Sequence, residues 1–165
     1  MSKQNELVQF SRGASGGGSK NIIVNGAMKI AQRSVSETGL GSADGYFTVD
    51  RFKIDVATAS AGRFTMSQHS DGPSGFANCI KLDCTTADTS IAAGERLILR
   101  HIIEGQDLQQ LKKGTSDAET FTVSFYVKGD AAATYSLSLY DGDNGRMISQ
   151  TFNVTTSWNR IELTF

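Results

Sequence analysis

Few residues in this chain are of types that carry out catalysis. The 165 residues include two histidines, His69 and His101, and two cysteines, Cys79 and Cys84. The chain has no GxxxxGK[ST] motif of the kind that binds phosphates. His101 lies in the apolar segment LILRHII, where we expect a half-buried, hydrogen-bonded ring and not a catalytic base. The sequence thus predicts a protein that is not an enzyme.

The two cysteines share one strand-like segment, NCIKLDC. Five residues at about 3.3 Å each place Cys79 and Cys84 roughly 16 Å apart, whereas a disulfide needs Cα atoms within about 7 Å. We therefore expect two free thiols. Cys84 shares a face with Ile80 and Leu82, which predicts a core position for it. With no CxxC motif, the cysteines do not form a metal-site pattern.

Two segments contain closely spaced aspartates, as calcium-binding loops do. The segment DGDNG at 141–145 begins like such a loop, but Arg146 stands at the sixth position in place of glycine and Phe152 at the twelfth in place of glutamate. We expect a hairpin turn there, and around Asp83 and Asp88 a turn with side-chain capping bonds. No cofactor is predicted; a structural calcium ion is left open, with no ligand set assigned to it.

Tyr126 and Tyr140 are the candidate glycan-binding side chains. Each lies opposite the apolar face of its expected strand, among serines and threonines. A tyrosine ring can stack on the C–H face of a sugar while its hydroxyl bonds to ligand or solvent. The alternative is that these rings pack against a loop or a neighbouring subunit. Trp158, the sole tryptophan, is expected to close one end of the fold.

Alternation of apolar and polar residues predicts eight or nine β-strands. The clearest is 119–128, and 96–103 is so apolar that we expect it to be buried on both faces. The expected strands are 22–30 (with a bulge or turn at Asn25-Gly26), 46–56, 62–68, 79–84, 96–103, 119–128, 134–140, 146–154 and 158–165. A short helix is predicted over 106–112, where Leu108 and Leu111 are three residues apart. The chain is therefore expected to be all-β, an antiparallel sandwich or barrel with one short helix.

Residues 1–20 differ in composition from the rest. SRGASGGGSK is typical of a flexible Gly/Ser linker, and before it Leu7, Val8 and Phe10 could anchor an arm that docks on a neighbouring subunit. The alternative is a disordered terminus. Residues 21–165 are predicted to form one domain. Because IELTF has no turn or tail after it, we expect that domain to be truncated at its C-terminus.

Charge and hydropathy exclude several classes of partner. The net charge is −1 with no long run of one sign, which argues against nucleic acid or anionic lipid. No apolar run approaches the roughly 20 residues of a membrane-spanning helix, and MSKQNELVQF lacks the apolar stretch of a signal peptide. We expect synthesis in the cytoplasm, from which lysis or assembly would carry the protein elsewhere.

Five segments resemble a family of bacteriophage structural proteins, and they follow one another in a characteristic order. They are NIIVNGAMKIAQR, YFTVDRFKI, GFANCIKLDCTTADTSIAAGERLILRHIIEGQDLQQL, FTVSFYVKG and SWNRIELTF. The resemblance spans 21–165, and IEGQDLQQL with the preceding TTADTSIAAGE is its most specific part. Virion-fibre domains of that family are similar to the jelly rolls of carbohydrate-binding modules.

The resemblance implies an antiparallel jelly-roll β-sandwich without enzymatic activity, placed on the virion after assembly in the host cytoplasm. The implied role is that of a tail-fibre or appendage domain that binds host surface polysaccharide. The implied partners are other virion proteins, engaged by the arm at Leu7, Val8 and Phe10, and two further copies in a homotrimer. Two alternatives stay open: a purely structural head-decoration or tail-adaptor protein, and a carbohydrate-binding module of a larger hydrolase.

Overall fold

The computed structural model describes residues 21–57 and 61–165. The predicted linker and the arm at Leu7, Val8 and Phe10 lie outside these residues. The described chain forms nine strands and one short helix: β1 Ser36–Leu40, β2 Phe52–Ala57, β3 Arg63–His69, β4 Cys79–Thr86, β5 Arg96–His101, η1 Gly105–Leu111, β6 Thr122–Val127, β7 Ala133–Asp141, β8 Arg146–Val154 and β9 Asn159–Thr164. This confirms an all-β protein with one short helix, η1 being a 3₁₀ helix over the predicted segment.

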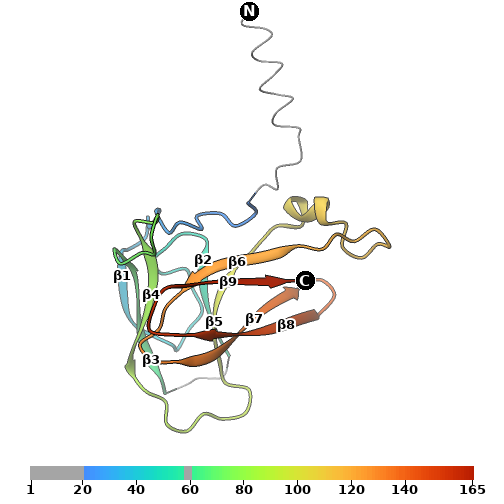
Figure 1. The fold of residues 1–165 in the computed structure, drawn as a ribbon. Coiled ribbons are helices and arrows are strands. Elements are labelled where there is room, and N and C mark those ends of the chain that lie inside the picture. Colours follow the sequence, from blue (N-terminus) through green and yellow to red (C-terminus); the bar gives the residue numbers. More distant parts are fainter. Residues whose placement is uncertain (1–20, 58–60) are drawn as a thin grey trace, which may run out of the picture.

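Every strand pairing is antiparallel. β1, β3 and β4 form a three-stranded sheet in the order β1-β3-β4, and the other strands form the pairs β2-β5, β6-β9 and β7-β8. Figure 1 shows β6 and β9 running side by side above the β7–β8 hairpin. Along the chain, the β7–β8 hairpin lies between the two strands of the β6-β9 pair, because β6 precedes the hairpin and β9 follows it.

The tightest core lies in the N-terminal half of the domain. Alternation in β2 buries Phe52 and Ile54, and alternation in β3 buries Phe64 and Met66, as period two requires when one face of a strand is covered. These side chains form one cluster, which Leu40 and Val49 complete. The predicted inward faces of both strands are therefore confirmed.

The C-terminal strands bury their apolar side chains less completely. In β6 the predicted alternation is present, with Val123, Phe125 and Val127 half-buried and the residues between them exposed. Phe125 meets Phe152 edge-on at 5.1 Å between ring centroids. Val154 is the one fully buried apolar side chain among the described residues of β6 to β9. This layer is therefore covered on its inner side only in part.

The hairpin between β7 and β8 is the predicted one. Its register runs without interruption from Ala133 opposite Val154 to Asp141 opposite Arg146. The Asp141 carboxylate accepts hydrogen bonds from the backbone N–H of Asp143 at 3.1 Å and from the Asn144 side chain at 2.7 Å. These bonds close the turn. They also lower the pKa of Asp141, and the bond from the Asn144 side chain has the largest effect.

Two expected strands are not formed as predicted. Residues 24–27 form a turn, so the Asn25-Gly26 turn is correct and the strand over 22–30 is wrong. The strand expected over 46–56 begins only at Phe52, because residues 50–51 form another turn, in which Arg51 adopts a left-handed φ of 75°. β1 at Ser36–Leu40 precedes it and is not among the expected strands. Apolar side chains in both segments pack on the core from turns and loops. Their spacing in the sequence therefore resembles the alternation of a strand.

Two expectations about burial are also wrong. β5 is not buried on both faces: Leu97 is 49 % exposed, because the face that it shares with Leu99 is open to solvent. Cys84 is exposed and not in the core, because the face that it shares with Leu82 is open to solvent. Cys79 and Cys84 are both free thiols, as predicted. No helix within the described ranges is long and apolar enough to cross a membrane.

Candidate ligand-binding surface

Tyr126 lies on the outward face of β6 beside a second exposed ring. Its ring centroid is 5.7 Å from that of Phe76, and the two planes are tilted by 54°. Tyr126 is 42 % exposed and Phe76 is 41 % exposed. The two rings therefore form an apolar surface open to solvent, although they come from positions fifty residues apart.

The sheet around Tyr126 is polar. Arg160 stands directly opposite Tyr126 on β9. Its guanidinium pairs with the Glu162 carboxylate at 2.9 Å and donates to the Ser124 hydroxyl at 3.4 Å. Hydrogen-bond donors and acceptors thus border the rings, which is the arrangement a sugar needs when its C–H face stacks and its hydroxyls bond at the side.

The loop between β3 and β4 places Phe76. Phe76 N–H donates to the Pro73 carbonyl at 2.9 Å in a tight turn. The turn needs glycine at position 72, because a Cβ there would lie 2.4 Å from the Phe76 carbonyl oxygen. The pair of Lys128 with Asp71 also ties this loop to the end of β6, and it lowers the pKa of the Asp71 carboxyl. Loop and sheet therefore hold the ring pair from both sides.

Tyr140 does not join this surface. It is 60 % exposed and stands opposite Met147 near the hairpin turn. Tyr126 is next to the end of β6 that leads into β7, whereas Tyr140 lies seven residues into β7, roughly 23 Å along that strand. The two predicted tyrosines are both exposed, but the structure does not bring them together.

Phe76 and Arg160 are absent from the sequence-based prediction. Phe76 lies in the loop segment PSGFA, where no periodicity marks it, and Arg160 is one of many polar residues on an outward face. Trp158 is only half-buried; the Lys128 ammonium lies 5.3 Å from its ring centroid. Pairing β6 with β9 brings Arg160 to Tyr126, and sequence spacing alone does not reveal which strand is the partner.

The His101 ring is half-buried and hydrogen-bonded, as predicted. Its Nε2 lies 3.1 Å from the Val24 carbonyl oxygen, and its ring meets Phe52 edge-on at 5.1 Å. Burial lowers the pKa of His101, and the charge of Arg51 acts in the same direction. The ring therefore joins the 24–27 turn to β5.

The acidic side chains take part in hydrogen-bonded turns and in ion pairs. Asp88 accepts from the Ser90 N–H at 2.9 Å, as the predicted capping turn requires. In the part of the chain that the structure describes, no three His, Cys, Asp or Glu side chains gather as metal ligands would. Asp55, 6 % exposed, pairs with Arg100 at 2.7 Å and joins β2 to β5.

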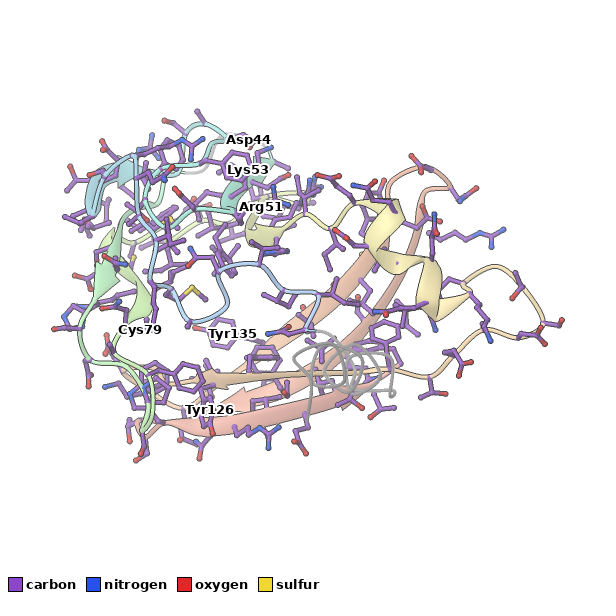
Figure 2. The ribbon with its side chains drawn as sticks, turned by 90° about the horizontal axis from the view of Figure 1, so that it is seen from above. Asp44, Arg51, Lys53, Cys79, Tyr126 and Tyr135 are labelled. Carbon is purple, nitrogen blue, oxygen red and sulfur yellow. The ribbon has the colours of Figure 1, made fainter. Side chains whose placement is uncertain are left out.

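The charged residues near Asp55 and the exposed rings lie in different regions. Figure 2 shows Asp44, Arg51 and Lys53 together, well apart from Tyr126. A cavity of about 220 Å³ lies between Asn21 and Gln106 on η1, below the 300 Å³ at which ligand pockets usually begin. The Tyr126 surface is therefore the better candidate for ligand binding.

Comparisons with protein-family models, with curated proteins and with solved structures give no match for this chain.

Proposed function

We propose that this chain is a non-enzymatic domain of a bacteriophage virion, in a tail fibre or another appendage, and that it binds host surface glycans through Tyr126 and Phe76. Glycan binding is proposed because the exposed rings of Tyr126 and Phe76 lie together on a polar sheet face. A place on the virion is proposed because the sequence resembles bacteriophage structural proteins.

A shallow platform of two rings suits a weak sugar site. Neither ring lies in a deep pocket, so affinity for one sugar unit is expected to be low. Several copies on one particle would raise the overall affinity, because each further contact becomes intramolecular. Arg160, Glu162 and Ser124 beside the rings supply the polar contacts that distinguish one glycan from another.

The positions of the few reactive side chains favour a role without catalysis. The His101 ring is engaged by Val24 and Phe52. The Asp55 carboxylate is held by Arg100, and Asp141 is bonded within its turn. In each case the side chain stabilises the fold.

We also propose that the domain is a jelly-roll β-sandwich. The nesting of the β7–β8 hairpin inside the β6-β9 pair supports this, because jelly rolls are built from nested antiparallel pairs of Greek-key type.

A purely structural virion protein is the second candidate. The half-covered apolar layer of β6 to β9 and the exposed Leu97 on β5 favour it, since such surfaces are typical of subunit packing. A head decoration or a tail adaptor would use the same domain for assembly alone.

Binding to isolated host polysaccharides tests the first candidate. The chain and the variants Tyr126→Ala and Phe76→Ala would be titrated against capsular and lipopolysaccharide fractions, with Tyr140→Ala as the matched control. We expect each ring variant to weaken binding about tenfold, the equivalent of about 1.4 kcal/mol, and Tyr140→Ala to bind normally. Equal binding by all four proteins would refute the assigned site, and failure of the parent chain to bind any fraction would favour the structural role.

A further inference from the structure

β7 has a hydrogen-bonded neighbour on one edge only. It pairs with β8 along all nine residues, and no other described strand joins it. In an antiparallel pair, about half of the residues of a strand direct N–H and C=O groups away from the partner. The free edge of β7 therefore presents a row of donors and acceptors to solvent.

This edge lacks the devices that keep sheet edges apart. From Ala131 to Tyr140 the chain has no charged residue and no proline, and the β7–β8 register has no bulge. Edge strands of monomeric proteins usually carry a lysine, a proline or a bulge for this purpose. Tyr135, on the same strand, is 56 % exposed. The edge is thus long, free of bulges and open to another strand.

The sequence of β7 is complementary to itself when two copies run antiparallel. Leu137 is the midpoint of Ala133–Asp141. A two-fold axis there places Tyr135 opposite Leu139, Ser136 opposite Ser138, Thr134 opposite Tyr140 and Asp141 opposite Ala133. All nine residues pair, apolar side chains meet on the inner face, and the two aspartates avoid each other.

We propose that β7 pairs with β7 of a second copy of this chain about a two-fold axis at Leu137. The interface is of the self-complementary kind that two-fold dimers use, and strand addition supplies its backbone hydrogen bonds. The net charge of −1 leaves little repulsion between copies. Tyr140 then packs against Thr134 of the second copy, so it contacts a subunit while Tyr126 stays free.

The first test is the mass of the full chain in solution, measured by sedimentation equilibrium up to roughly 100 µM. We expect a dimer in reversible exchange with the monomer. Ser136→Lys/Ser138→Lys places four lysines across the axis and should raise the dissociation constant about tenfold or more. The matched control, Ser149→Lys/Thr151→Lys, changes the residues opposite these serines on β8 and should leave the dimer intact. Circular dichroism confirms that both variants fold.

Cross-linking tests the register. In a Cys79→Ser/Cys84→Ser background, Ser136→Cys and Ser138→Cys are made as two separate proteins. Because position 136 faces position 138 across the axis, we expect disulfide dimers to form in the mixture much faster than in either protein alone. A monomeric or trimeric parent chain, a dimer that the β7 lysines do not weaken, or equal cross-linking in all three samples would each overturn the proposal.

Discussion

Asn25 organises a segment that has no strand of its own. Its carboxamide donates to the carbonyls of Ile30 and Asp50, both at 2.9 Å, and accepts from the N–H groups of Lys29 and Ile30, both at 3.1 Å. Its φ of 58° is a left-handed value that asparagine tolerates better than most residues. One side chain thus joins the 24–30 segment to the turn before β2.

Replacing Asn25 should therefore be costly. We expect Asn25→Ala to lower the free energy of unfolding by about 2–4 kcal/mol, since four hydrogen bonds are lost and the backbone becomes strained. Asn25→Gly relieves the strain and should still cost about 2 kcal/mol. Urea unfolding measures both. The control is Asn21→Ala, which removes a single bond to Ile23 N–H; a loss from Asn25→Gly no greater than from Asn21→Ala would contradict this role.

His101 should make stability depend on pH. Burial lowers its pKa in the folded state, so the unfolded chain takes up the proton at a higher pH than the folded chain. Its contribution to stability is therefore complete above the unfolded value of about 6.5 and declines as the pH falls through that value toward the lower pKa of the folded state.

The slope between pH 7 and 5 gives the test. Unfolding free energies would be measured across this range, which extends from just above the unfolded value to well below it, for the parent chain and His101→Gln. We expect His101→Gln to flatten the curve, by at most one proton per molecule. A curve that is unchanged in His101→Gln would show that the ring does not carry the effect.

At the scale of elements, the β7–β8 turn depends on one glycine. Gly145 has a left-handed φ of 62°, whereas Gly142 in the same turn does not need glycine for its backbone and has room for a Cβ, 3.8 Å from the Tyr140 ring. We expect Gly145→Ala to destabilise the domain by about 1–2 kcal/mol and Gly142→Ala to change stability little. Denaturant unfolding compares them; equal effects would argue against the hairpin as described.

The elements differ in how well the sequence predicts them. Strands β6 to β9 follow from alternation alone, because half-buried residues alternate with exposed ones along at least part of each strand. The 22–30 segment misleads because Ile23 and Met28 pack on the core from either side of the 24–27 turn. Period two tells which residues share a face and not whether anything covers it, which is why Leu97 and Cys84 were expected to be buried.

The candidate site was predictable only in part. Tyr126 is identifiable as a large ring on a Ser/Thr-rich face. Phe76 is not, because its place beside Tyr126 depends on the Gly72 turn and on the pair of Asp71 with Lys128, and these are contacts between distant segments. Tyr140 has the same local pattern as Tyr126 and a different neighbourhood, so local pattern alone does not separate a ligand platform from a subunit contact.

In the whole molecule, the ring pair lies where two parts of the domain meet. The N-terminal part has the fully buried cluster around Ile54 and Met66, and the C-terminal part has half-buried strands. The β3–β4 loop links them through Phe76 on Tyr126 and Asp71 on Lys128. A ligand that stacks on both rings would touch both parts at once, so we expect glycan binding to raise the melting temperature of the domain.

The most direct test of glycan binding on the virion surface is the attachment of the fluorescently tagged chain to intact cells from a panel of bacterial hosts. We expect saturable binding to some strains, competition by their own surface polysaccharide, and loss of binding in a folded Tyr126→Ala/Phe76→Ala variant but not in Tyr140→Ala. Absence of binding to every strain by the well-folded chain, or full binding by the double variant, would contradict the proposed glycan binding.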